Sequence, residues 1–233
     1  MQFLPQYPAI LNLFGFGRCA VPDFEDDRPQ GWEVAVGADH GETETHLVAI
    51  ARSPSQPRIT FLLGLAHIRP KADADFASSW LLEPLQEFIA QVSPDILVTD
   101  ANGCGVDRSF QIAHEFGQKM TVLRVRFNAA PPRKSPPNLK SAGTQERGSV
   151  IVVHPESLVR DFFNAIDHGL FKVPRGFYRK QEFPEFVAHH SSYRVQTGAR
   201  APRFQKSRTI PAHFMDCHLM ARFGFNTLDG VSA

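Results

Sequence analysis

Apolar positions fall in short runs along the chain, and turn-forming residues separate these runs. The first three runs, residues 33–39, 45–52 and 58–66, are divided by polar or proline-containing stretches such as SPSQP. Runs of this length and composition predict β-strands. Because the connections are too short for a crossover, we expect the three strands to be joined by hairpins and antiparallel.

The rest of the chain mixes strand and helix patterns. Strand patterns occupy residues 95–100, 119–127 and 150–154. Helical spacing occupies residues 77–92, 106–117, 155–170 and, at the C-terminal end, a segment that begins in IPAHFMDCHLM. This order is typical of an α/β fold with an RNase H-like mixed sheet, in which three antiparallel strands are followed by parallel strands and helices flank the sheet.

One RNase H-like domain is predicted over residues 33–233. Residues 1–32, which contain several prolines and the acidic run DFEDD, are interpreted as an N-terminal arm or the remnant of a linker. Inside the domain, residues 128–149 are basic and rich in proline and predict a long loop, and residues 171–209 are predicted to be basic and irregular. Loops of this length in a compact domain are usually functional.

Composition narrows the class of protein. A chain of 233 residues with 42% hydrophobic content is long enough for one sizeable α/β domain. Its apolar runs are too short to span a membrane, so no membrane partner is expected. The three cysteines show no paired spacing, which predicts a reduced, cytoplasmic setting.

The net charge of +1 hides an asymmetry between two parts of the chain. Residues 1–118 carry 7 Lys and Arg against 16 Asp and Glu, whereas residues 119–208 carry 17 against 6. Two regions of opposite sign indicate an acidic pole that attracts metal ions and a basic surface that attracts a polyanion. An ordinary solvated surface is the alternative interpretation.

Three carboxylates fall where this fold would bring them together. Asp39 ends the first predicted strand and Asp100 ends the fourth, and these two strands are neighbours in an RNase H-like sheet. Asp216, in the last helix, can complete the cluster, and His213 lies three residues earlier on the same helix face. Carboxylate oxygens suit Mg²⁺ or Mn²⁺. We therefore predict that all four residues are catalytic and that the three aspartates bind two such ions.

Each of these residues also has a structural explanation. Asp39 and Asp100 are each followed by turn-forming residues, and aspartate favours turns. Asp216 would be favourable near a helix N-terminus, and His213 could be a buried core histidine. Asp107, a fourth candidate acid, is interpreted as a helix cap. The joint pattern of two strand-end acids and one helix acid is what favours a metal site.

Four sequence motifs resemble those of one known family. They are VAVGADHG, ILVTDANGCGVDRSFQIA, HPESLVRDFFNAIDHGLFKVP and AHFMDCHLMARFGF, within residues 33–225. These motifs are similar to those of the C-terminal nuclease domain of bacteriophage terminase large subunits. The resemblance implies a metal-dependent endonuclease that cleaves concatemeric double-stranded viral DNA during genome packaging, in the host cytoplasm, by two-metal-ion hydrolysis.

The resemblance also implies partners, and the chain departs from the family in one respect. The portal, the small terminase subunit and an ATPase domain are the candidate partners besides double-stranded DNA. The chain has no G-x-x-x-x-G-K-[ST] phosphate loop, which the N-terminal ATPase of a terminase large subunit would carry. ATP-driven packaging is therefore not attributed to this chain.

The basic part of the chain would hold the DNA duplex. The candidate phosphate contacts lie in the predicted loop and just before the last helix: Arg133, Lys134, Lys140, Arg200, Arg203, Lys206 and Arg208. Contacts of this kind carry little sequence information and depend strongly on salt. Solubility is the alternative explanation for these residues.

Rival functions remain open at the level of sequence. The stretch DHGET at Asp39 fits D-x-G-x-T, a phosphate loop of actin-like ATPases and sugar kinases, and an RNase H-like fold is also compatible with a Holliday-junction resolvase, a transposase or a non-catalytic packaging module. Cys217 and His218 lack the second Cys/His pair that a zinc site would need. His189 and His190 are interpreted as surface residues.

Overall fold

The computed structural model describes residues 19–23, 29–70, 79–127, 150–197 and 202–230. The strands of the main sheet are β1 (Ala20–Val21), β2 (Glu33–His40), β3 (Thr45–Arg52), β4 (Thr60–Ile68), β5 (Ile96–Asp100), β6 (Thr121–Phe127), β7 (Ile151–Val153) and β8 (Phe171–Pro174). A separate hairpin consists of β9 (Tyr193–Thr197) and β10 (Pro202–Lys206). The helices are α3 (Ser79–Val92), α4 (Gly105–Phe116), α5 (Pro155–Asp167), the 3₁₀ helix η1 (Arg175–Arg179), α6 (Phe183–His190) and α7 (His213–Leu228).

The sheet has the predicted mixed topology. Its strand order is β1-β8-β4-β3-β2-β5-β6-β7. The first three predicted strands, β2, β3 and β4, pair antiparallel, and β5, β6 and β7 continue from β2 in parallel. The predicted fold class, an RNase H-like mixed sheet flanked by helices, is therefore confirmed.

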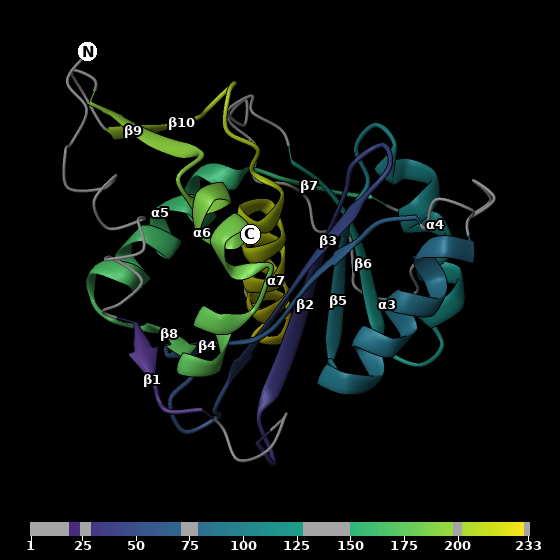
Figure 1. The fold of residues 1–233 in the computed structure, drawn as a ribbon, viewed down its shortest axis with the longest axis horizontal. Coiled ribbons are helices and arrows are strands. Elements are labelled where there is room, and N and C mark those ends of the chain that lie inside the picture. The colour runs from purple at the N-terminus through teal and green to yellow at the C-terminus, as the bar shows by residue number, and fades with distance from the viewer. Residues whose placement is uncertain (1–18, 24–28, 71–78, 128–149, 198–201, 231–233) are drawn as a thin grey trace.

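Helices cover both faces of this sheet (Figure 1). Alternate residues along a strand point to opposite faces, so each strand contributes to two cores. Ala35 and Val98 pack in the core beneath α5, α6 and α7, whereas Val36 and Leu97 pack in the core beneath α3 and α4. Because the central strands are buried on both sides, they read in the sequence as continuous apolar runs.

Helix α7 lies directly on β2, and one glycine makes this contact close. A Cβ atom added at Gly37 would lie 1.9 Å from the backbone oxygen of Cys217, a distance that no side chain could occupy. The Cys217 thiol donates to the backbone oxygen of His46 on β3 at 3.0 Å. The sequence at these positions thus fixes the N-terminal half of α7 over the ends of two strands.

The prediction that residues 171–209 are irregular is wrong for most of this range. The region contains β8, η1, α6 and the β9–β10 hairpin, and β8 extends the sheet by pairing in parallel with both β4 and β1. These elements are four to eight residues long. Helices of this length show little more than two turns, and strands of this length show only two or three residues on each face, so the pattern did not separate these elements from loops.

Strand β1 lies in the segment that was interpreted as an arm, and its two residues join the edge of the sheet beside β8. The predicted boundary between residues 32 and 33 remains a prediction. The predicted loop at 128–149 lies outside the described residues. Among the helices that the structure describes, none is long and apolar enough to cross a membrane.

Candidate active site

Strand register places acidic and imidazole side chains in one row. Asp39 on β2 lies opposite His46 on β3, and His46 lies opposite His67 on β4. On the other side of β2, Thr99 of β5 lies beside Ala38, so Asp100 follows at the level of Asp39. Asp39 and Asp100 are separated by an even number of residues from Ala35 and Val98, and their side chains therefore face α7.

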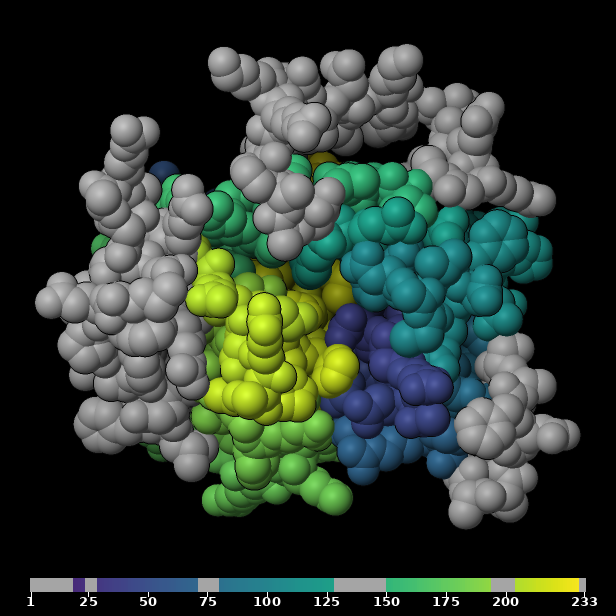
Figure 2. All heavy atoms as spheres, turned by 90° about the horizontal axis from the view of Figure 1, so that it is seen from above, coloured from purple at the N-terminus to yellow at the C-terminus, as the bar shows by residue number. Residues whose placement is uncertain are grey.

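Helix α7 brings the other two predicted catalytic residues to this row. His213 and Asp216 occupy its first turn. The His213 Nδ1 atom donates to Asp39 Oδ2 at 2.6 Å. Asp39, Asp100, Asp216 and His213 thus meet at one end of the sheet, although their catalytic role stays a prediction. Figure 2 views this end, where the yellow chain leading into α7 lies against the purple chain of the β2–β3 turn, with a recess between them.

Burial and mutual repulsion control the protonation of two of the aspartates. Asp100 and Asp216 are each 6% exposed. Burial and the Asp39 carboxylate raise the pKa of Asp100 to about 7, and two hydrogen bonds from Asn102 only partly oppose this. Burial also raises the pKa of Asp216 to about 6, although Lys206 lowers it. Carboxylates that repel in this way are stabilised by a cation between them.

Asp39 behaves differently because it has an ion-pair partner. Burial alone would raise the pKa of Asp39, but the hydrogen bond and charge of His213 outweigh it and lower the pKa. The same hydrogen bond raises the pKa of His213, against the effect of burial. The pair is therefore an imidazolium beside an ionised carboxylate.

The donor type suits a divalent cation. Three carboxylates supply hard oxygen atoms, which is the ligand type that Mg²⁺ and Mn²⁺ take in proteins. Asp39 and Asp216 both act on the pKa of Asp100, so the three groups are close enough to interact. Lys206 Nζ donates to Asp216 Oδ2 at 2.5 Å and supplies one positive charge to the cluster. With the His213 imidazolium beside Asp39, Asp100 is the carboxylate of the three that has no positively charged partner among the described residues.

The sequence interpretation missed two contacts that hold Asp216. Tyr193 on β9 donates from its hydroxyl to Asp216 Oδ1 at 3.0 Å, and Lys206 on β10, predicted as a DNA contact, bonds the other oxygen. Both come from the β9–β10 hairpin, which was not predicted. Alternating apolar and polar residues in YRVQT and PRFQK, with four residues between them, were the signal that could have found it.

The other predicted DNA contacts are only partly described. Arg133, Lys134, Lys140 and Arg200 lie outside the described residues. Arg203 lies on β10, and Arg208 is exposed just before α7. These two residues lie in the segment that leads into the site.

The prediction for two histidines was wrong. His189 and His190 were interpreted as surface residues, but they are 5% and 0% exposed because α6 packs between η1 and α7.

Other histidines form a second layer of side chains behind Asp39. The His46 ring stacks on the His213 ring, with centroids 4.8 Å apart and planes 9° apart. His46 Nε2 lies 3.3 Å from Glu185 Oε1, so this network orients the imidazole that holds Asp39.

The donor atoms of His46, Glu185 and His189 lie within 4.8 Å of one another, a spacing compatible with a metal ion. However, His189 Nδ1 accepts the backbone N–H of Phe214 at 3.3 Å. A neutral histidine that accepts at Nδ1 carries its proton on Nε2, the atom that faces Glu185. The contacts therefore favour a hydrogen-bonded network over a metal site.

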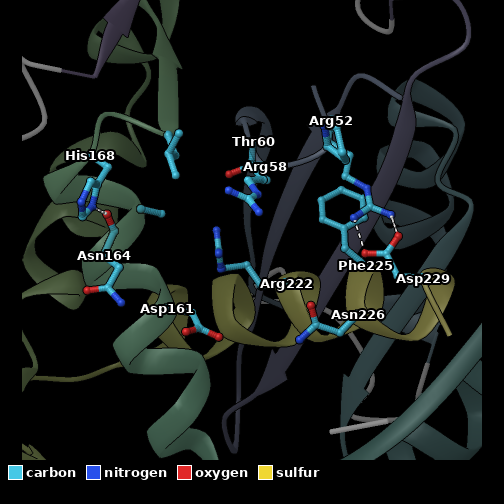
Figure 3. Close-up of a pocket in the computed structure, with 13 residues that line it drawn as sticks. Arg52, Arg58, Thr60, Asp161, Asn164, His168, Arg222, Phe225, Asn226 and Asp229 are labelled. Carbon is cyan, nitrogen blue, oxygen red and sulfur yellow. Dashed lines mark hydrogen bonds and ion pairs between the residues drawn. The ribbon is translucent and has the colours of Figure 1, made fainter. Parts of the chain in front are cut away.

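A separate cleft of about 430 Å³ lies along the C-terminal half of α7 (Figure 3). It is lined by parts of β3, β4, α5 and α7, and none of its lining residues belongs to the predicted active site. The aspartate cluster lies at the opposite, N-terminal end of the same helix. The cleft is therefore distinct from the candidate active site.

Solved structures of other proteins share this fold, although their sequences are very different. No family model matches the sequence, and no curated protein sequence matches it. The human cytomegalovirus terminase nuclease domain matches with a TM-score of 0.51 and 11% identity over 95% of this chain and 94% of that one. The nuclease domain of the large terminase subunit gp2 of bacterial virus Sf6, solved with manganese, matches with a TM-score of 0.52 and 13% identity over 81% and 87%. The chain thus has the RNase H-like fold of terminase nuclease domains.

Proposed function

We propose that this chain is a divalent-metal-dependent endonuclease that hydrolyses double-stranded DNA. The observation that carries the proposal is the convergence of Asp39, Asp100 and Asp216, from β2, β5 and α7, at one end of the sheet. The shared fold with terminase nuclease domains supports an activity of the same kind. The raised pKa values of Asp100 and Asp216 are those expected of a carboxylate cluster built for cations.

Asp39, Asp100 and Asp216 would hold two Mg²⁺ or Mn²⁺ ions. Such ions, when bound, activate a water molecule and stabilise the leaving oxygen of a phosphodiester. The chain itself places the carboxylates on rigid supports, since two belong to strand ends and the third to a helix in direct contact with β2. Rigid placement limits the reorganisation that the reaction requires.

His213 and Lys206 supply positive charge beside the carboxylates. His213 is held at Nδ1 by Asp39, and its Nε2 lies 3.9 Å from Glu44 Oε1. Its raised pKa keeps a proton on Nε2, which can be donated to a phosphate oxygen or a leaving group. Lys206, about half exposed at its side chain, remains on Asp216 and can contact a phosphate from there.

The biological role that we propose is cleavage of concatemeric viral DNA during genome packaging. The motif resemblance and the terminase-like fold both favour it. In this role the basic residues of the predicted loop at 128–149 and of the segment before α7 hold the duplex. The portal, the small terminase subunit and an ATPase domain would be its partners.

The turn after Asp39 argues against the kinase-like alternative. The backbone N–H of Gly41 donates to the backbone oxygen of Glu44 at 2.9 Å, and Arg108 donates to the backbone oxygens of Gly41 and Glu42. A phosphate loop presents free backbone N–H groups to its ligand. In this turn the Gly41 N–H is bonded internally and two carbonyl oxygens are held by Arg108, which favours a nuclease site as the interpretation of Asp39.

Nicking of supercoiled plasmid in Mg²⁺ or Mn²⁺ tests the proposal. We expect Asp39→Asn, Asp100→Asn and Asp216→Asn each to lower the rate by at least about 1,000-fold, because each removes an ion ligand. His213→Ala should cost less, about 10- to 100-fold, because it removes proton transfer and positioning but no ion ligand. Asp107→Asn, an exposed acid in the first turn of α4, is the matched control and should retain activity.

Unchanged nicking by the aspartate variants would reject the assignment. The same assay on linear duplexes and on four-way junctions separates the nuclease classes, because a Holliday-junction resolvase would cleave only the branched substrate. ATP binding without DNA cleavage would select the kinase-like alternative.

A further inference from the structure

The cleft at the far end of α7 gathers arginine side chains from three elements. Arg52 ends β3, Arg58 lies in the turn between β3 and β4, and Arg222 lies in α7. Figure 3 shows Arg58 and Arg222 directed into the same space, next to Thr60 at the start of β4. No residue of the proposed active site takes part in this cleft, so the question of what it binds is separate.

The three arginines differ in how their charge is compensated. Arg52 is fully engaged, since its guanidinium donates to Glu33 at 2.6 Å and to both oxygens of Asp229 at 2.6 and 2.8 Å. By contrast, neither Arg58 nor Arg222 forms an ion pair within the part of the chain that the structure describes. Arg52 is therefore a structural residue, and the other two carry the available positive charge.

Two buried polar atoms at this cleft lack a hydrogen-bond partner among the described residues. They are the Nη1 atom of Arg222 and the Oγ1 atom of Thr60, a residue that is only 4% exposed. Leaving a buried donor unpaired is unfavourable, and more so when the donor is charged. Such atoms in a native protein are expected to meet a partner, and here both belong to residues that line the same cleft.

We propose that this cleft binds an oxyanion of the phosphate type, held by the guanidinium groups of Arg58 and Arg222. The planar guanidinium fork matches phosphate oxygens, and two arginines can chelate one phosphate group. The cleft volume of about 430 Å³ lies within the range of small-molecule sites and leaves room for a group attached to the phosphate.

One acidic residue in the cleft sets a limit on its affinity. Asp161 of α5 lines the same space, and its charge raises the pKa of Arg222, against the larger lowering effect of burial. Asp161 is exposed and forms no ion pair within the described residues. It would repel a bound oxyanion, so its removal should strengthen binding, which is a change that a merely structural role would not produce.

The phosphate group has two sources: a free phosphorylated small molecule or the backbone of DNA. Isothermal titration of the full chain with inorganic phosphate and with dAMP examines the first source. Anisotropy of a labelled duplex examines the second. Both are run at constant ionic strength, because non-specific phosphate contacts weaken steeply with salt.

If the ligand is a small molecule, we expect phosphate or dAMP to saturate one site per chain. If the ligand is the DNA backbone, we expect the variants below to change duplex binding instead. Arg58→Gln and Arg222→Gln should each weaken binding about 10-fold or more, since hydrogen bonds between charged groups are lost. Asp161→Asn should tighten it several-fold. Arg160→Gln is the matched control, because Arg160 is an exposed arginine of α5 that pairs with Glu156 and does not line the cleft.

The proposal is overturned if neither phosphate, dAMP nor the duplex responds to Arg58→Gln and Arg222→Gln more than to Arg160→Gln. A response of the small ligands assigns the site to a phosphorylated small molecule, and a response of the duplex alone assigns it to the DNA backbone. Arg58 is exposed, so Arg58→Gln keeps the test valid if Arg222→Gln fails to fold. Asp39→Asn should bind phosphate normally, which separates this site from the proposed nuclease.

Discussion

At the scale of single residues, the candidate site contains three aspartates in different electrostatic states. Asp39 is paired with His213, and Asp216 is paired with Lys206 and Tyr193. Among the described residues, Asp100 accepts hydrogen bonds from the backbone and side-chain amide groups of Asn102 alone. Their pKa values follow the strength of this pairing. The pKa of Asp39 is lowered, that of Asp216 is raised to about 6, and that of Asp100 is raised the most, to about 7. The least compensated carboxylate is where a cation would contribute most.

These shifts predict how the stability of the metal-free protein depends on pH. A folded-state pKa of about 7 for Asp100 and about 6 for Asp216 lies above the unfolded value, so the folded state binds more protons in this window. Taken alone, Asp100 therefore makes stability fall as pH rises from about 4 to about 8, by roughly 3 to 4 kcal/mol, and the raised pKa of His213 acts in the same direction. Buried histidines with lowered pKa values, such as His40, His46 and His190, oppose this effect below about pH 7.

Thermal unfolding in EDTA across this pH range measures the effect. Asp100→Asn isolates the part due to Asp100: relative to the parent, the variant should gain stability as pH rises, and addition of Mg²⁺ should stabilise the parent most at pH 8. A stability difference between parent and Asp100→Asn that does not change with pH in EDTA would contradict the assigned protonation state of Asp100.

At the scale of elements, the contact between α7 and β2 positions half of the site. Gly37→Ala would force a Cβ atom into the Cys217 backbone, which is not a flexible group that can move aside. We expect a loss of about 1–3 kcal/mol or more and a fall in nicking, because Asp216 moves away from Asp39. Denaturant unfolding together with the nicking assay measures both.

A matched control comes from the same hairpin. A Cβ atom at Gly41 would lie 3.0 Å from the flexible Glu44 side chain and 3.6 Å, an ordinary van der Waals distance, from the Glu44 backbone oxygen, so Gly41→Ala should change stability little. Equal losses in the two variants would mean that the close helix–strand contact has no special role.

The β9–β10 hairpin controls the charge of Asp216 through Lys206 and Tyr193. Lys206→Met removes the cation that lowers the pKa of Asp216. The ionised form would then appear at higher pH, so the pH profile of nicking should shift to the alkaline side by roughly one unit or more. Lys119→Met, at an exposed residue of the turn before β6, is the control, and an unshifted Lys206→Met profile would count against this role.

At the scale of the whole molecule, the basic part of the chain is expected to dominate DNA affinity. Replacing Arg133, Lys134 and Lys140 together with alanine should reduce the slope of log K against log salt concentration by about 3, if each contacts one phosphate. Fluorescence anisotropy with a labelled duplex, at several salt concentrations, measures this slope. An unchanged slope would assign these residues to solubility.

The sequence predicted β2, β3, β4 and β5 because these strands are long or continuously apolar. Asp39 and Asp100 stood out since they end such strands. His46 and His67 did not stand out. They lie in one row with Asp39 only because of the register between strands, and the sequence of a single strand does not determine that register. Tyr193 was missed for a different reason, since its short hairpin carries weak periodicity.

The burial of two histidines could not be predicted from the sequence either. His189 and His190 are adjacent and polar, which favoured a surface position, yet α6 is covered by α7 and η1 and both rings are buried. Their burial depends on tertiary contacts between elements far apart in sequence. Whether neighbouring histidines on a short helix are buried or exposed can be decided only when those contacts are known.

The central claim is that Asp39, Asp100 and Asp216 chelate divalent ions, and anomalous diffraction from crystals soaked in Mn²⁺ tests it most directly. The account predicts anomalous peaks about 2.0–2.3 Å from oxygens of these three carboxylates, and their loss in Asp100→Asn crystals. Peaks only elsewhere, such as at His46 and Glu185, or no peak at saturating Mn²⁺, would contradict it.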